Sequence, residues 1–155
     1  MRRWIEKALR LARNRDGNAM VEFAIGSAVL VAAFTGTFQF GYTFLQYNNL
    51  ENAVARGARY ASLVPYDSAT TTPSDAFKTA VKNMVLYGSK TAGTSPVLPG
   101  LTTGNVNLSV TFTNGIPSAM TVSVSGYTID SIFATTALTN KPQVAYAYQG
   151  IWSPI

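Results

Sequence analysis

The sequence predicts an α+β protein in which a long N-terminal helix packs on a small antiparallel sheet of about three strands. Two observations predict this fold class. A stretch without charged residues runs from Phe23 to Leu50 and continues as an amphipathic helical pattern. After about residue 105, apolar residues recur at every second position, which is typical of strands. The parts expected are a basic leader over 1–17, a long helix over 18–62 and a Ser/Thr-rich α+β domain over 63–155.

Charge is concentrated in the leader. The formal net charge is +5, of which residues 1–17 carry +4. A nucleic-acid-binding protein spreads its basic residues over a folded face, so we expect no nucleic-acid partner. The chain contains no Cys and no His, which excludes disulfides, thiolate chemistry and Ser-His-Asp triads. We therefore expect a structural or binding protein that is not an enzyme and holds neither a cofactor nor a metal ion.

The apolar stretch is long enough to cross a bilayer, with the transmembrane part at about residues 23–45. The basic leader precedes it, so the positive-inside rule predicts a cytoplasmic N-terminus and a C-terminal part outside. A cleaved secretory signal has a shorter apolar region and a small-residue cleavage site close behind it, which this chain lacks. A buried helix of a soluble core remains the alternative.

Small residues recur at every fourth position of the helix. One stripe lies in the apolar part, and a second lies beyond it. The first stripe consists of Ala24, Ala28, Ala32 and Gly36, and the second consists of Ala53, Gly57 and Ala61. This spacing places them on one face, where a second helix can approach closely. Chance alignment of common small residues is the alternative.

Beyond the membrane part, Leu50, Val54 and Ala61 keep the helical spacing, and we expect one helix from about residue 20 to 62. Arg56 and Arg59 lie on one side of it. They could contact acidic partner groups or lipid headgroups, or simply form a solvated face.

The outer domain should contain one short helix and three strands. Ser74 as N-cap and Gly88 as C-cap predict a helix over 75–88. Alternation predicts strands over 106–112 and 120–124, with a turn at Asn114-Gly115 and Pro117, and a third strand over 143–151. The connection over 127–142 shows no clear pattern, and we expect at most a short helical turn there.

The junction RNRDG-NAMVEFAI, with Gly17, Asn18, Glu22 and Phe23, resembles the processing site of type IV prepilins of the Flp/Tad subclass. The following segment FQFGYTFLQYNNLENAVARGARYAS is similar to the TadE-like family of minor pseudopilins. The resemblance implies a pilin-like fold and cleavage by a prepilin peptidase between Gly17 and Asn18. It also implies that Glu22 pairs with the new N-terminal amine, of its own or a neighbouring chain. Without the resemblance, Glu22 could simply lie at the headgroup boundary.

The function that the resemblance implies is that of a minor pseudopilin of the tight-adherence pilus machinery in the bacterial inner membrane. Its partners would be other pilins or pseudopilins, the Tad inner-membrane machinery, the peptidase and the lipid bilayer, and it could also enter the extracellular pilus. The alternative is an uncleaved, membrane-anchored periplasmic binding or envelope-scaffold protein. A hydrolase that pairs a serine with Lys78 or Lys82 is a third hypothesis, but the chain has no G-x-S-x-G or S-x-x-K motif.

Overall fold

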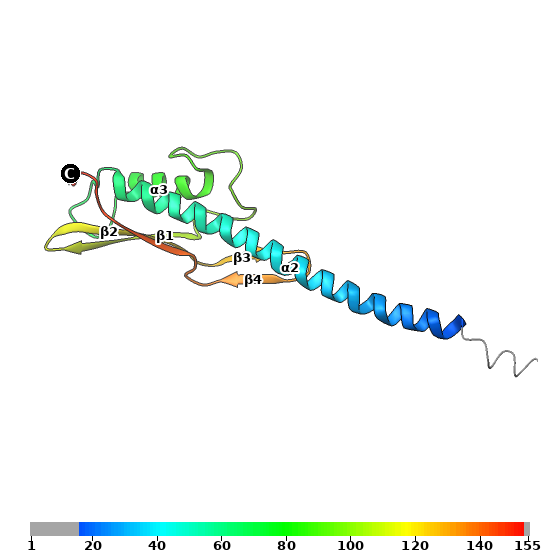
Figure 1. Ribbon diagram of the computed structural model, residues 1–155. Helices are drawn as coiled ribbons and strands as arrows, with labels where there is room; N and C mark the ends of the chain where they lie inside the picture. Colours follow the sequence, from blue (N-terminus) through cyan, green and yellow to red (C-terminus); the bar gives the residue numbers. More distant parts are fainter. Residues whose placement is uncertain (1–15, 154–155) are drawn as a thin grey trace, which may run out of the picture. The chain divides into compact units, whose positions relative to one another are not determined.

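The computed structural model describes residues 16–153, so the leader predicted over 1–17 lies outside the described residues except for its last two positions. By the contacts within the chain, the molecule divides into two compact units, Met1–Phe40 and Gly41–Ile155. The long helix α2 (Asp16–Leu63) contributes to both (Figure 1). The expected long N-terminal helix is confirmed, although it begins a turn earlier than residue 20.

The first unit contains, among its described residues, only the part of α2 up to Phe40. Its large apolar side chains are more than half exposed, with Phe23 at 78 % and Phe34 at 74 %. Of the described residues, α2 is the one helix long and apolar enough to cross a membrane by length and composition, with a mean hydropathy of 1.8 in its most apolar window.

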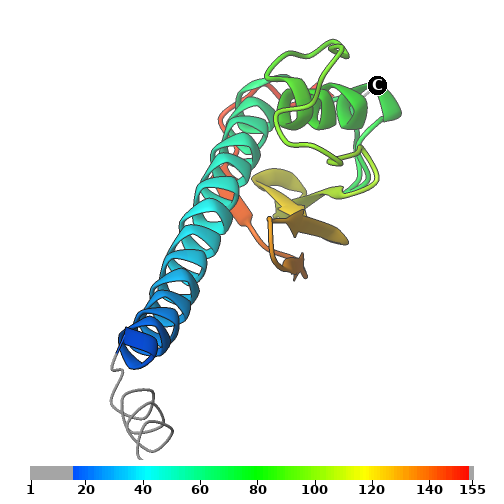
Figure 2. The same cartoon turned by 90° about the vertical axis from the view of Figure 1, so that its right-hand side faces the viewer.

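The second unit adds the helix α3 (Asp75–Tyr87) and five strands. Ser74 caps α3 by accepting a hydrogen bond from the Phe77 N–H at 3.1 Å, and Gly88 ends it in the left-handed conformation with φ of 70°. Both caps are the ones that the sequence predicts. α3 lies beside the C-terminal part of α2 in both views (Figures 1 and 2).

The main sheet is antiparallel, with strand order β1-β2-β5. Its strands are β1 (Val106–Thr113), β2 (Ile116–Val124) and β5 (Gln143–Ala147). β1 and β2 are joined at Asn114-Gly115, both with positive φ, which is the geometry of a type I′ turn. The expected fold of a long helix on a small antiparallel sheet of three strands is confirmed, although β5 ends at Ala147 instead of residue 151, and Pro117 lies in β2.

The connection that we expected to contain at most a helical turn is instead a second, two-stranded sheet. It consists of β3 (Tyr127–Asp130) and β4 (Thr135–Leu138), paired antiparallel. The sequence gives a weak signal here because the strands have only four residues each, and β4 is largely exposed.

The core of the second unit lies between the inner face of α2, α3 and one face of the main sheet. Leu50, Val54 and Ala61 of α2 are fully buried, as their helical spacing predicts. In β1 and β2 the apolar positions of the alternating pattern point to the same core, and α3 adds Val81 and Val85. The amphipathic part of α2 therefore covers the apolar face of the sheet.

Candidate functional site

The predicted processing junction lies in the first turns of α2. Gly17 and Asn18 are exposed, and a Cβ atom added at Gly17 would meet no other atom within 4 Å. Packing therefore gives no reason for a glycine at this position. Glycine also destabilises a helix by about 1 kcal/mol relative to alanine. Glu22 and Phe23 are exposed on the following turn.

The first small-residue stripe is fully accessible within the chain. Ala24, Ala28, Ala32 and Gly36 are all exposed, and nothing lies within 4 Å of a Cβ atom added at Gly36. Two hydroxyl groups of this stretch, on Ser27 and Thr37, donate hydrogen bonds to carbonyls of the preceding turn at 2.9 Å. Their polar atoms are thus satisfied inside the helix, as a lipid environment requires.

The second stripe lies in the core of its own chain. Ala53, Gly57 and Ala61 are buried, and a Cβ atom added at Gly57 would overlap Cγ2 of Val85. α2 and α3 therefore approach closely at Gly57, and this stripe packs within the chain. The spacing of small residues indicates a close approach but not which element makes it.

Arg56 and Arg59 are both exposed. In the part of the chain that the structure describes, the ion pair found joins Lys78 Nζ and Asp75 Oδ1 at 3.0 Å, and it involves neither arginine. Arg59 borders an open depression of about 370 Å³ together with Tyr146 and Gln149, next to the edge strand β5. This surface could receive a carboxylate or phosphate group of a partner.

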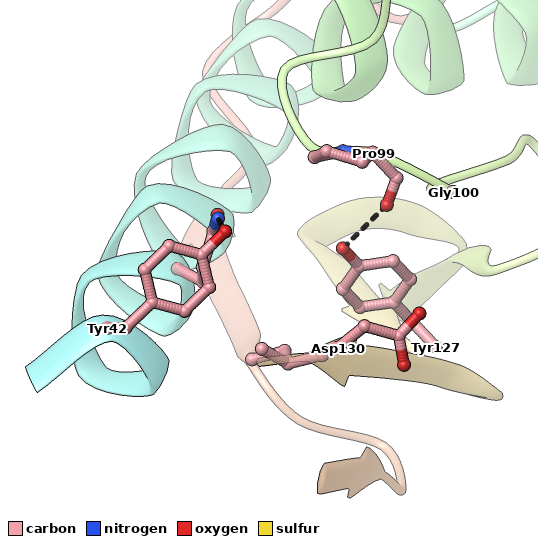
Figure 3. A pocket seen from close by; sticks show the side chains of 7 residues that line it. Tyr42, Pro99, Gly100, Tyr127 and Asp130 are labelled. Carbon is pink, nitrogen blue, oxygen red and sulfur yellow. Dashed lines mark hydrogen bonds between the residues drawn. The ribbon is translucent and has the colours of Figure 1, made fainter. Parts of the chain in front are cut away.

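A smaller pocket of about 140 Å³ lies between α2, the loop before β1 and the β3 strand (Figure 3). The Tyr127 hydroxyl donates to the Pro99 carbonyl at 3.0 Å, and Gln46 donates to the Tyr42 hydroxyl at 2.9 Å. Burial raises the pKa of Tyr127, and the nearby Asp130 carboxylate adds to this effect. Among the described residues that line the pocket, Asp130 is the one carboxylate, and the paired acids that general acid–base hydrolysis uses are not found there.

An aromatic cluster joins the end of α2 to the C-terminal segment. Tyr66 is fully buried and packs edge-on against Phe77, Phe112 and Tyr148, with ring centroids 5.4, 5.9 and 6.4 Å away. The Tyr66 N–H donates to the Tyr148 hydroxyl at 2.8 Å, and Trp152 donates to the Ser68 carbonyl at 3.0 Å. Burial raises the pKa of both Tyr66 and Tyr148.

Sequence reasoning missed this cluster. The available signal was the aromatic residue directly after the helix, Tyr66, together with the aromatic residues near the C-terminus. Their pairing spans more than 80 positions, which no local pattern reveals. The cluster closes the second unit and presents no reactive constellation.

No candidate metal site is found among residues 16–153, and Lys78, one of the two lysines of the serine–lysine hypothesis, pairs with an aspartate. No group of three or more His, Cys, Asp or Glu side chains there could hold a metal ion. Lys78 pairs with Asp75, and Ser74 donates a hydrogen bond to Asp67 while it caps α3. These groups have structural partners, and the features left for function are the exposed helix face and the two surface depressions.

Comparison with known proteins gives one match. The family model for TadE-like proteins matches residues 17–59, which confirms over this segment the resemblance seen in the sequence. The match covers the exposed apolar stretch and most of the buried face of α2. No curated protein and no solved structure matches the chain.

Proposed function

We propose that this chain is a minor pseudopilin of the tight-adherence (Flp/Tad) pilus assembly machinery. The span at residues 23–45 holds it in the inner membrane, with a cytoplasmic N-terminus and a periplasmic outer domain. It acts by packing its helix on the helices of other pilins or pseudopilins, either at the base of the pilus or within it. No reaction is catalysed.

The observation that carries the proposal is the coincidence of the family match with an accessible apolar helix. The match favours involvement in the Flp/Tad pilus system, and the TadE-like family is a pilus-associated, structural family without enzymatic activity. Within the matched segment, the large apolar side chains from Phe23 to Phe38 are more than half exposed, and the described residues of their unit form no element besides α2. Such a surface requires lipid or other helices around it.

Processing between Gly17 and Asn18 fits the geometry of the junction. Gly17 has no packing role among the described residues, and both Gly17 and Asn18 are exposed, so the bond between them is accessible. Cleavage would create an α-amine on Asn18, four residues before Glu22. Residues at this spacing are neighbours on a helix, so the cationic amine and the carboxylate can pair and lower the cost of placing each in lipid.

The test of processing is the intact mass of the protein extracted from membranes with and without the prepilin peptidase. We expect a chain that starts at Asn18 only when the peptidase is present. A Gly17→Trp chain should remain uncut, whereas the matched control Met20→Trp, at another exposed position three residues on, should be cut normally.

A precursor of unchanged mass in both strains would contradict processing and would favour the uncleaved, membrane-anchored periplasmic protein. A Gly17→Trp chain that matures and supports piliation would do the same. The role of Glu22 is tested separately with Glu22→Gln, which should be processed normally but should enter the pilus machinery poorly because the amine loses its charged partner.

A further inference from the structure

We propose that the turn between β3 and β4 is a second membrane contact, in which Ile132 and Phe133 insert into the outer interface of the bilayer beside the end of the helical span. The inference rests on the proposed function, since it requires that residues 23–45 cross the membrane. It adds a lipid-binding surface on the outer domain that the helix alone does not predict.

The first observation is the exposure of two large apolar side chains at the turn. Ile132 is 60 % exposed and Phe133 is 62 % exposed. They are adjacent, and no charged residue occurs between Asp130 and Lys141. Paired exposed apolar side chains on a turn are unfavourable in water and are typical of segments that dip into the interface of a membrane.

The second observation is the position of this turn along α2. The Ser131 hydroxyl lies 3.1 Å from the Thr43 hydroxyl, at hydrogen-bonding distance. Thr43 stands two residues before the end of the predicted span, among the aromatic residues that an interfacial belt uses. The hydrogen bond thus places the base of the turn beside the part of α2 where the proposed span ends.

The third observation is that polar groups of the turn form hydrogen bonds within the turn. The Ser131 N–H and the Ser131 hydroxyl both donate to the Ala134 carbonyl, at 3.1 and 2.8 Å. The turn therefore closes on itself, which lowers the cost of moving it out of water. Asp130, at the end of β3, is exposed and limits the insertion to the two apolar residues, because its carboxylate remains in the headgroup layer.

The other hairpin of the domain provides a matched control. Ile116 is 54 % exposed and follows the Asn114-Gly115 turn. Phe112, on the same hairpin, packs against Tyr66, which follows the end of α2. Because Thr43 and Leu63 are separated by 20 residues of α2, about 30 Å at the helical rise, Ile116 should lie well away from the bilayer.

The chain contains no Cys, so single cysteines report one position each. The full chain carrying Ile132→Cys, Phe133→Cys, Ile116→Cys or Leu30→Cys is labelled with an environment-sensitive fluorophore in phosphatidylglycerol/phosphatidylethanolamine vesicles. Each label is then quenched by iodide from the water and by doxyl groups on the lipid acyl chains. We expect positions 132 and 133 to be quenched by the lipid and to lose most of the iodide quenching seen at 116.

The label at position 30 tests the proposed span independently of the membrane contact of the turn. If position 30 is quenched by lipid while 132 and 133 respond to iodide as 116 does, the span stands and the membrane contact of the turn is overturned. Protection of 132 and 133 from both quenchers would also overturn it, since a second protein copy would then cover the turn. If position 30 itself responds to iodide, the span and the inference built on it both fail.

Discussion

The two stripes of small residues on α2 have the same spacing and opposite surroundings. Ala24, Ala28, Ala32 and Gly36 are exposed, whereas Ala53, Gly57 and Ala61 are buried against elements of their own chain. The difference lies in what the chain supplies around each stripe. The second unit provides α3 and a sheet, while the described part of the first unit provides no other element. A stripe of small residues thus predicts a close contact, and the fold decides whether that contact is internal or remains available.

The largest contrast is expected for leucines on the two stretches. Leu50 is fully buried, so Leu50→Ala should lower the free energy of unfolding by about 2–5 kcal/mol. Leu30 is 61 % exposed, and Leu30→Ala should change it by less than about 0.5 kcal/mol. Denaturant unfolding of the full chain in mild detergent, followed by near-ultraviolet circular dichroism, measures both. Equal losses would contradict the division of α2 into a buried and an accessible stretch.

The glycines of the two stripes give the next contrast. Gly57→Ala should destabilise the chain by about 1–3 kcal/mol, because its Cβ overlaps Cγ2 of Val85, a β-branched side chain with few rotamers on a helix. Gly36→Ala should be neutral or stabilising by up to about 1 kcal/mol, since helix propensity improves and nothing is displaced.

The overlap at Gly57 can be relieved to test its cause. In the Gly57→Ala, Val85→Ala double variant, the loss of stability should be smaller than the sum of the two single losses, because the shortened side chain leaves room for the new Cβ. Strict additivity in the same unfolding measurement would show that the two residues do not contact each other.

Substitutions of the alanines in the accessible stripe should change the association of the chain with other helices and leave its free energy of unfolding unchanged. In native membranes, Ala28→Cys and Ala32→Cys should form disulfide-linked products under mild oxidation, whereas Leu30→Cys, on another face of the helix, should form few. Ala28→Leu should weaken the association about tenfold, or about 1.4 kcal/mol, while unfolding is unchanged. Equal crosslinking at all three positions would indicate random collision and would contradict the stripe as a packing face.

The smallest effect is expected at alkaline pH, and it should be confined to the second unit. Burial raises the pKa of Tyr66 and Tyr148, so above about pH 10 the unfolded chain loses these protons before the folded chain does. The free energy of unfolding should be constant below pH 10 and fall above it, by at most about 1.4 kcal/mol per pH unit for each tyrosine.

The control is Tyr66→Phe, which keeps the ring in its cluster but cannot titrate. Its stability should fall less steeply with pH than that of the unaltered chain, although its stability at pH 7 is lower because the 2.6 Å hydrogen bond to Thr70 is lost. Residues 16–40 contain no tyrosine, so helical circular dichroism from that stretch should persist at pH 11. An unchanged slope in Tyr66→Phe would assign the alkaline loss to other groups.

The elements that the sequence predicts well are those set by local chemistry. Ser74 and Gly88 define both ends of α3, because a side-chain cap and a left-handed glycine satisfy the terminal backbone groups wherever the helix packs. Alternation over 106–112 and 120–124 and the Asn114-Gly115 turn similarly define the β1–β2 hairpin. β3 and β4 were not predicted, because four residues are too few to show an alternation of apolar and polar positions.

The candidate site was predicted in part. The small residues of the exposed helix stretch were found from their spacing, and Gly17 and Glu22 from the resemblance to type IV prepilins. Their roles in processing and assembly remain predictions. The aromatic cluster of Tyr66 and the turn at Ile132 were not found, because their meaning depends on neighbours far away in the chain: Tyr148 for the first and Thr43 for the second.

The sequence by itself therefore determined the long apolar helix, the capped short helix, the main hairpin and the resemblance to TadE-like proteins. These follow from charge, period and capping groups, which act between residues close in the chain. The tertiary structure decided that Gly57 packs against Val85, whereas no atom lies within 4 Å of a Cβ atom added at Gly36. It also decided that the β3–β4 turn lies at hydrogen-bonding distance from Thr43 of the helix. Such contacts depend on how distant segments pack, because close packing in a core is a property of the whole arrangement and not of any local pattern.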